Sequence, residues 1–163
     1  MLKSVLTLIL TIALLAAELA GGNVPLPQIL PAAEPDTVQS AGGLDDYMTS
    51  VAVQSSAIKD FLEYEAMTQT DMNLKSQELY ELWDGALNYL WAELKNRLPE
   101  EDFAALENEQ LAWNTEKEHA VKEAGREFEG GSIYPLVVNS EAARLTEERA
   151  YRLYNLLKEA ETP

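Results

Sequence analysis

Residues 70–98 read TDMNLKSQELYELWDGALNYLWAELKNRL, and this stretch decides the fold class. Its apolar residues recur every three or four positions, as they do along the buried face of an α-helix. They form one continuous stripe made of Met72, Leu79, Leu82, Trp83, Ala86, Leu87, Leu90, Trp91, Leu94 and Leu98. The stretch therefore predicts a long amphipathic helix over about 70–98, and Thr70 stands where an N-cap residue is expected.

Helical spacing continues on both sides of this stretch. The apolar residues predict a first helix near 44–66, a third from about 100 to 128 and a fourth that begins near Ser140. No pairs of alternating strands appear. Because long helices with one apolar face bury it best against one another, we expect an all-α fold, an antiparallel helical bundle of three long helices plus an N-terminal helix.

Proline and glycine mark the connections between these helices. Pro99 separates the second helix from the third, in a position that the first turn of a helix tolerates. Gly130-Gly131-Ser132 ends the third helix, with a glycine in the left-handed conformation. The next residues, 133–138, read IYPLVV and predict an extended apolar crossing, after which Ser140 is the expected N-cap of the fourth helix.

The N-terminus has the pattern of an export segment. Lys3 precedes an apolar run over residues 5–17, and a helix of this length spans about 20 Å, less than the roughly 30 Å hydrocarbon core of a bilayer. The pattern predicts a secretory signal peptide over residues 1–22, cleaved after the small residues at 15–17 or at 20–22. A retained N-terminal anchor is the alternative, and it would give the chain its membrane contact.

A proline-rich stretch follows the export segment. Residues 23–43 hold four of the chain's seven prolines and end in two glycines. Prolines at this density prevent helix formation and favour an extended, semi-rigid spacer. We therefore divide the chain into a signal peptide over 1–22, a Pro/Gly-rich linker over 23–43 and a helical domain over 44–163.

Charge and composition exclude several classes of protein. The 163 residues include 12 Lys and Arg, 28 Asp and Glu and no Cys, for a net charge of -16. Loss of residues 1–22 would remove Lys3 and Glu18, one charge of each sign, so the charge would stay at -16. Such acidity repels a phosphate backbone, which excludes nucleic acid as an expected partner, and it favours cationic partners. The lack of cysteine excludes disulfide scaffolds, thiolate metal sites and cysteine nucleophiles.

The sequence holds no recognisable catalytic or metal-binding set. His119 is the single histidine; Glu116 and Glu123 share its helical face, but a di-metal bundle site needs a second Glu-x-x-His copy. No Gly-x-Ser-x-Gly elbow and no P-loop are present. We therefore expect no enzyme, no metal and no cofactor, and an unrecognised hydrolase has no residues to support it.

Three tryptophans and one lysine are the residues most open to interpretation. Trp83 and Trp91 lie near the apolar stripe, so core packing is the first interpretation for them and for Trp113. The alternative is that one of the three edges a groove in which a partner or ligand stacks. Lys117 follows Trp113 by four positions on the apolar face of the third helix, which implies a buried carboxylate partner or a side chain that reaches out to water.

Five short segments share their order and spacing with a known family. Along residues 68–157 they are Thr68-Gln69-x-Asp71-Met72-Asn73, Leu87-Asn88-x-x-Trp91, Gln110-x-Ala112-Trp113, Gly130-Gly131-Ser132-x-x-Pro135 and Leu145-Thr146-x-x-Arg149. Together they resemble the lysozyme inhibitor LprI-like family, in which Arg-Asp is usual where Lys117-Glu118 stands here. The resemblance implies an exported, all-helical domain of bacterial envelope and secreted proteins, of which one branch inhibits lysozyme.

The sequence departs from that family at its cysteines. Family members usually carry cysteines at three places, which Lys75, Val121 and Glu141 occupy here. All three are absent together, as expected if whole disulfides were discarded. The resemblance then implies a bundle that is held by packing alone.

Two functions fit these observations. The first is a non-catalytic, exported protein of the bacterial envelope that binds or inhibits a lysozyme-type cell-wall hydrolase, because acidic charge attracts a cationic enzyme. The second is an extracytoplasmic helical module that binds a small ligand or peptide between its helices.

The residues that could serve these functions fall into two sets. The first set is an acidic patch on the third helix, for which a solvated helix face is the alternative, and comprises Glu100, Glu101, Asp102, Glu107, Glu109, Glu116 and Glu118. The second set holds the candidate partner-binding residues Trp83, Trp113, Lys117, Glu118, Gly130, Gly131, Ser132 and Pro135.

Overall fold

A computed structural model describes residues 43–65 and 67–160 of the chain. The predicted signal peptide and both of its predicted cleavage points lie outside the described residues, as does the predicted linker apart from Gly43. Within the described residues no helix is long and apolar enough to span a bilayer.

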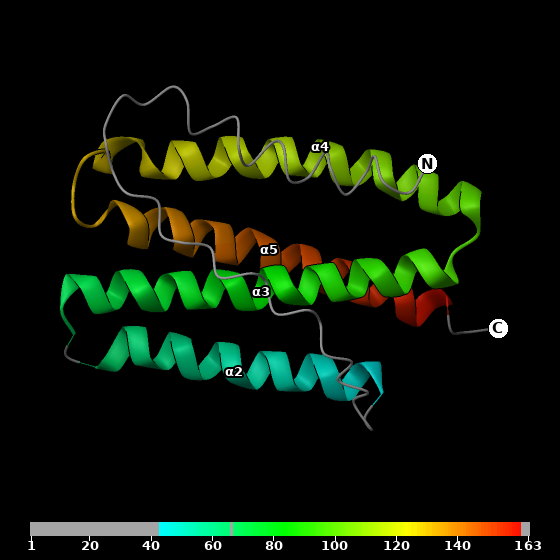
Figure 1. The fold of residues 1–163 in the computed structure, drawn as a ribbon, viewed down its shortest axis with the longest axis horizontal. Helices are drawn as coiled ribbons and strands as arrows, with labels where there is room; N and C mark the ends of the chain where they lie inside the picture. The colour runs from blue at the N-terminus through cyan, green and yellow to red at the C-terminus, as the bar shows by residue number, and fades with distance from the viewer. Residues whose placement is uncertain (1–42, 66, 161–163) are drawn as a thin grey trace, which may run out of the picture. The chain divides into compact units, whose positions relative to one another are not determined.

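The described residues form four long helices and no strand, which confirms the all-α prediction (Figure 1). Successive helices are joined by short connections and run in opposite directions. The elements are α2 (Leu44–Tyr64), α3 (Gln69–Arg97), α4 (Glu100–Gly125), a short 3-10 helix η1 (Arg126–Phe128) and α5 (Tyr134–Ala160).

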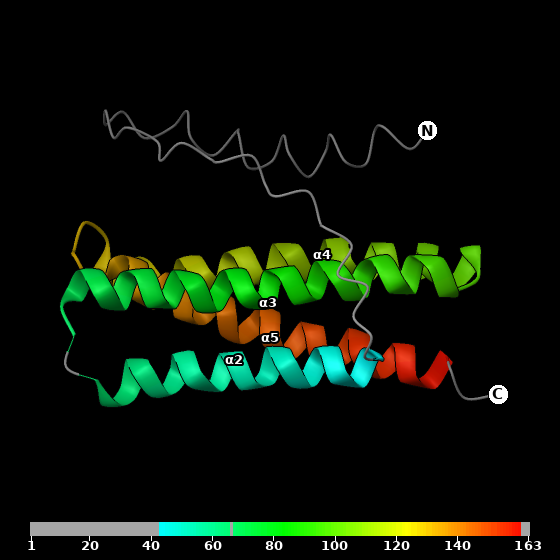
Figure 2. The ribbon, with the colours of Figure 1, turned by 60° about the horizontal axis from the view of Figure 1, so that its bottom comes forward.

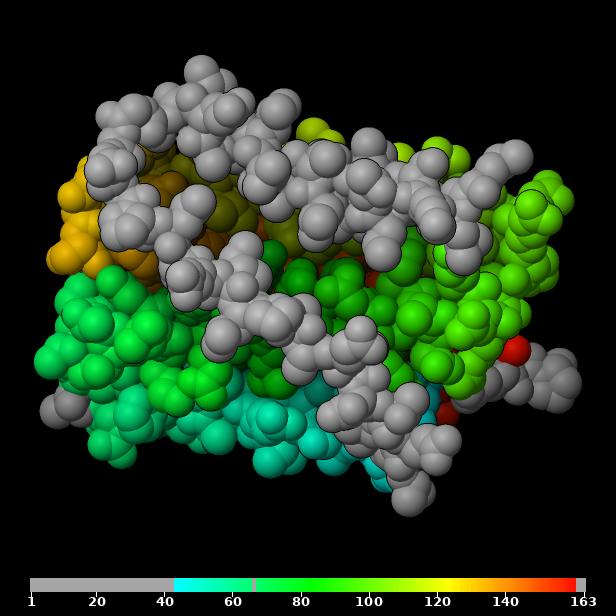
Figure 3. Space-filling model, viewed as in Figure 1, coloured from blue at the N-terminus to red at the C-terminus, as the bar shows by residue number. Residues whose placement is uncertain are grey.

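The bundle is organised around α3 and α5. These two helices lie parallel to each other and make the most extensive interhelical contact, with α2 packed against α3 and α4 packed against α5 (Figures 1 and 2). The side chains of α2 and α3 meet along one face of the bundle (Figure 3). Because α4 has its main contact with α5, much of its surface faces solvent.

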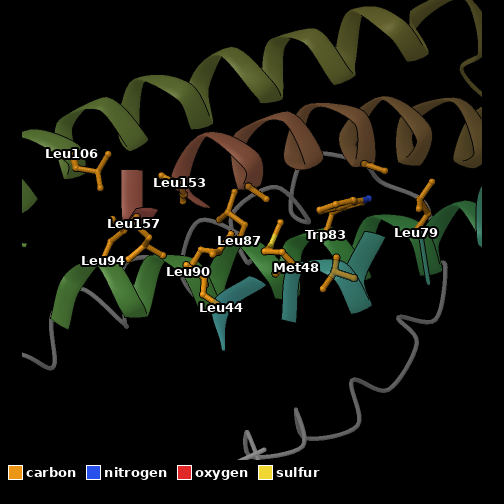
Figure 4. Close-up of a cluster of buried hydrophobic side chains, with 14 of the residues drawn as sticks. Leu44, Met48, Leu79, Trp83, Leu87, Leu90, Leu94, Leu106, Leu153 and Leu157 are labelled. Atoms are coloured by element: carbon orange, nitrogen blue, oxygen red, sulfur yellow. The ribbon is translucent and has the colours of Figure 1, made fainter. Parts of the chain in front are cut away.

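The core confirms the apolar stripe of α3. Leu90 and Leu94 of α3 and Leu153 and Leu157 of α5 are fully buried and form one cluster (Figure 4). In each helix the pair is four residues apart, the spacing at which side chains share a face. The cluster explains how the bundle folds without disulfides, since burial of a leucine side chain contributes about 1.5–3 kcal/mol.

Trp83 lies where three helices meet. Its side chain is fully buried, and its indole Nε1 donates a hydrogen bond to Ser55 Oγ of α2 at 3.0 Å. Its ring centroid lies 5.5 Å from that of Tyr151 on α5. Trp83 therefore belongs to the core, in agreement with the first interpretation of this residue.

Replacing Ser55 with alanine tests the importance of this hydrogen bond. We expect the free energy of unfolding to fall by about 1–2 kcal/mol, because the substitution leaves the buried indole N–H of Trp83 without an acceptor. Urea unfolding, followed by tryptophan fluorescence, measures the change. Ser56→Ala on the exposed side of α2 is the matched control, and an equal loss there would contradict the prediction.

The N-cap of α3 is Thr68, so the prediction of Thr70 was wrong. Thr68 Oγ1 accepts a hydrogen bond from the Asp71 backbone N–H at 3.2 Å, and the Thr68 N–H donates to Asp71 Oδ2 at 3.1 Å. This reciprocal capping box needs the acceptor side chain three residues after the cap. Asp71 meets that spacing from Thr68, and it lies directly after Thr70.

The start of α5 is the second correction. Residues 133–138 are not extended, because α5 begins at Tyr134, and Ser140 lies inside the helix instead of capping it. Helical geometry places Tyr134 and Val138, four residues apart, against Gly125 of α4. Pro135 fits the first turn, where its missing N–H is not needed.

The third helix is followed by a glycine turn, as predicted, but its α-helical part ends earlier than the predicted residue 128. The α-helix ends at Gly125, and the last predicted residues, up to Phe128, form η1. Gly130 then adopts φ 76°, the left-handed conformation expected for the glycine that ends this helix. The Gly131 N–H donates to the Phe128 carbonyl at 2.9 Å, which closes the turn.

Candidate functional site

Arg149 of α5 is a buried cation held by α4. Its side chain is only 2% exposed, and Nε donates to Gln110 Oε1 at 2.8 Å. Its Nη1 donates to Glu109 Oε1, and the guanidinium carbon lies 5.7 Å from the Trp113 ring centroid. Three side chains of α4 therefore contact this one arginine, and together they fix the register of α4 against α5; they are Glu109, Gln110 and Trp113.

The hydrogen bonding of this cluster is incomplete. Arg149 Nη2 and Thr146 Oγ1 are buried and have no hydrogen-bond partner within the described residues. The Glu109 carboxylate also forms an ion pair with Arg152, whose Nη2 lies 3.1 Å from Glu109 Oε1. The hydrogen bond from Arg149 is the main reason that the pKa of Glu109 is lowered. Glu109 is thus paired with two arginines of α5.

Lys117 lies against two aromatic rings. Its Nζ is 4.9 Å from the ring centroid of Trp113, one turn earlier on α4, and 5.4 Å from that of Tyr80 on α3. Burial lowers the pKa of Lys117, although the charges of Asp84 and Glu118 oppose this shift. No carboxylate within the described residues forms an ion pair with Lys117, so the first of the two alternatives for this residue does not hold, and its ammonium lies against the two aromatic rings.

Tyr80 completes this half-buried cluster between α3 and α4. Burial, followed by the charge of Asp84 and a hydrogen bond with it, raises the pKa of Tyr80 to about 12. The phenol therefore stays neutral at physiological pH and presents a ring face to the ammonium of Lys117. Tyr80, Trp113, Lys117 and Arg149 form a continuous aromatic and cationic cluster on three helices.

The glycine loop is tied to the start of α3. Asn73 Nδ2 donates a hydrogen bond to the Ser132 carbonyl at 2.9 Å, and Gln69 Nε2 donates to Asn73 Oδ1 at 3.0 Å. Two of the segments quoted for the family resemblance thus meet at one end of the bundle. Their contacts order a turn and leave Gly130 and Gly131 exposed.

The structure does not bring the eight predicted partner-binding residues into one site. Trp83 is in the core, whereas Trp113 and Lys117 lie together between α3 and α4. Glu118 is exposed on α4 beside Lys117. The remaining four belong to the turn before α5 and to its first residues, and they are Gly130, Gly131, Ser132 and Pro135.

Arg149 was missed as a site residue, although the sequence contains a signal for it. It follows Leu145 by four positions and precedes Leu153 by four, so it falls on the apolar face of the last helix. A cation on such a face predicts a partner from another helix. Tyr80 gives no comparable local signal, because its role depends on which helix lies beside α3.

The seven residues of the predicted acidic patch on α4 fall into two groups, one carboxylate that is paired within the fold and six that are not. Glu109 is paired with Arg149 and Arg152, as described above. Within the part of the chain that the structure describes, none of the other six forms an ion pair; they are Glu100, Glu101, Asp102, Glu107, Glu116 and Glu118. His119 is exposed, and no group of three potential metal ligands occurs in the described ranges.

Two open grooves occur on the bundle surface. One, of about 490 Å³, lies between α2 and α3 and includes Phe61, Lys75 and Glu78 in its wall; we call it the α2/α3 groove. The other, of about 410 Å³, lies between the start of α4 and the end of α5, and we call it the α4/α5 groove. The lining of the α4/α5 groove consists of Leu98, Asp102, Ala105, Leu106, Glu109, Leu156, Glu159 and Ala160.

Comparison with known protein families gives a match over more than half of the chain. A family model described as lysozyme inhibitor LprI matches residues 63–153. No curated protein and no solved structure matches the chain significantly. The matched range contains all of α3 and α4 and the Arg149 cluster.

Proposed function

The chain belongs to the lysozyme inhibitor LprI family, and from this we propose that it is an exported, non-catalytic envelope protein that binds and inhibits a lysozyme-type cell-wall hydrolase. The hydrolase would be cationic, and the bound domain would act by covering the enzyme's substrate cleft. Residues 1–22 would direct export, and the linker over 23–43 would separate the bundle from the point of attachment or release.

The observation that carries this proposal is the set of six α4 carboxylates without an ion pair. Carboxylates that are compensated inside their own fold add little to the attraction of a partner, whereas uncompensated ones attract cations over a distance of about 8–10 Å at moderate ionic strength. Because α4 packs mainly on α5, its remaining faces are accessible to a protein. The net charge of -16 adds a long-range field of the same sign.

A lysozyme turnover assay tests the proposal. We expect the purified protein to inhibit at micromolar concentration in low salt, and inhibition to weaken as ionic strength rises, because screening slows the steered association. The substrate should be a small uncharged glycan, so that competition between two polyanions, the inhibitor and the cell wall, does not imitate inhibition. Absence of inhibition in low salt would overturn the proposal.

A further inference from the structure

We propose that the α4/α5 groove receives a lysine or arginine side chain from a basic protein partner. The inference rests on the proposed function only for the identity of that partner, a lysozyme-type hydrolase. The shape, the lining and the charges of the groove support a cationic side chain independently of that identity.

The lining of the groove matches the two parts of a long cationic side chain. Five of its eight residues are apolar and three are carboxylates, and no cation lines it. The α4 residues Asp102, Ala105, Leu106 and Glu109 share one helical face, so apolar and acidic side chains alternate along the same wall. Lysine and arginine have an apolar stem and a charged head, and such a groove can hold the stem while its rim binds the head.

Two of the three carboxylates in the lining carry a negative charge that no described residue compensates through an ion pair. Glu109 is compensated by Arg149 and Arg152, whereas Asp102 and Glu159 form no ion pair with any described residue. Asp102 comes from the first turn of α4 and Glu159 from the last turn of α5, which lie at the same end of the bundle (Figure 1). The groove thus has one uncompensated carboxylate on each wall.

Glu159 gives the second argument for an external cation. A carboxylate in the first turn of a helix, such as Asp102, is stabilised by the helix dipole, but one in the last turn is destabilised by it. The neighbouring Lys158 forms an ion pair with Asp45 of α2, with 3.0 Å between Lys158 Nζ and Asp45 Oδ1. Glu159 therefore gains nothing from the dipole of its own helix, and a cation from a partner would compensate it.

The α2/α3 groove has a different arrangement of charges and serves as the control, because both of its carboxylates, Glu78 and Glu81, come from α3 and the groove also contains a lysine. Lys75 lines it, pairs with Glu78 and lies 5.4 Å from the Phe61 ring centroid, so this groove already contains its own cation. Its volume and its mixture of apolar and acidic residues are otherwise similar. A substitution of the same kind in each groove therefore separates a specific pocket from general acidity.

The first experiment compares A105K with A57K, because both alanines are exposed, helical and line a groove. Each variant adds one positive charge to the protein. In A105K the new lysine occupies the α4/α5 groove, so we expect the inhibition constant for lysozyme to rise at least about tenfold. We expect A57K to change it less than about threefold, the effect of net charge alone. Equal effects of the two variants would overturn the proposal.

The second experiment removes the charges and does not depend on lysozyme. An oligo-arginine peptide is titrated into the protein while amide signals of residues 102–109 and 156–160 are followed by NMR. We expect these signals to shift in the wild type, and the shifts to be lost in D102N/E159Q and kept in E78Q/E81Q. The same melting temperature in both double variants would exclude a folding defect.

The two proposals fail in different ways. Peptide shifts at the α4/α5 groove without lysozyme inhibition would support the groove and overturn the proposed function. Inhibition by the wild type that A105K and D102N/E159Q leave unchanged would support the function and overturn the groove. Peptide shifts spread evenly over the surface would also overturn the groove.

Discussion

Replacing Gly125 with leucine is expected to lower the free energy of unfolding by about 3 kcal/mol or more. A β-carbon built at Gly125 would lie 2.6 Å from Val138 Cγ1 and 2.7 Å from Tyr134 Cε2. Both distances are well below van der Waals contact, and neither neighbour moves freely, since valine is stiff at χ1 and the tyrosine ring is rigid. Any larger side chain must therefore push the end of α4 away from the start of α5.

Gly85 of α3 provides the matched control for this substitution. It is also helical, but it is exposed, and a β-carbon there meets no atom within 4 Å. Replacing it with leucine should raise stability by up to about 1 kcal/mol, because leucine has the higher helix propensity. Urea unfolding of G125L and G85L compares the two directly. If both variants changed stability in the same direction, the close approach at Gly125 would not be essential.

The same contact explains which part of the fold could not be predicted from sequence. The stripe of α3 was predictable because every residue needed for it lies within one helix, and Leu79, Trp83, Leu90 and Leu94 are buried as expected. The first turns of α5 pack on Gly125 of α4, across the intervening turn, and periodicity within one segment does not reveal such a contact between two helices. A short apolar run beside a proline suits an extended segment equally well until that neighbour is known.

The contacts of the candidate site are also of two kinds. Those within one helix can be predicted from the sequence, and those between helices cannot. The pairing of Trp113 with Lys117 follows from their spacing of four residues on one helix. Tyr80 and Arg149 join them only because α3 and α5 both lie beside α4, and helical periodicity contains no information about which helices become neighbours. The α4/α5 groove likewise depends on two helix ends that are far apart in the sequence.

Replacing Arg149 with alanine is expected to lower the free energy of unfolding by about 3 kcal/mol, a large part of the 5–15 kcal/mol typical of a domain. The loss comes mainly from the cavity that forms between α4 and α5 and from the acceptor of Gln110 that is left unpaired. A stranded charge contributes less, because the Glu109 side chain is 40% exposed and keeps Arg152 at 3.1 Å.

Arg144→Ala is the control for this prediction. Arg144 is on the same helix and also binds two carboxylates, Glu141 and Glu148, but its side chain is 52% exposed. Exposed ion pairs contribute about 0–1 kcal/mol, so R144A should cost less than about 1 kcal/mol. Comparable losses in R144A and R149A would show that burial of Arg149 is not what makes it important.

Methionine at position 149 separates packing from charge. If the cavity dominates, R149M should recover most of the stability lost in R149A, because an apolar side chain of similar length fills the same space. The pH dependence should change in both variants. The lowered pKa of Glu109 contributes stability above the pKa of the unfolded chain, and this contribution is lost as pH falls through the lowered pKa of the folded state. Without Arg149 the loss of stability at acid pH should therefore be smaller than in the wild type. For the packing argument, an R149M variant as unstable as R149A would assign the main role to the guanidinium and its hydrogen bonds.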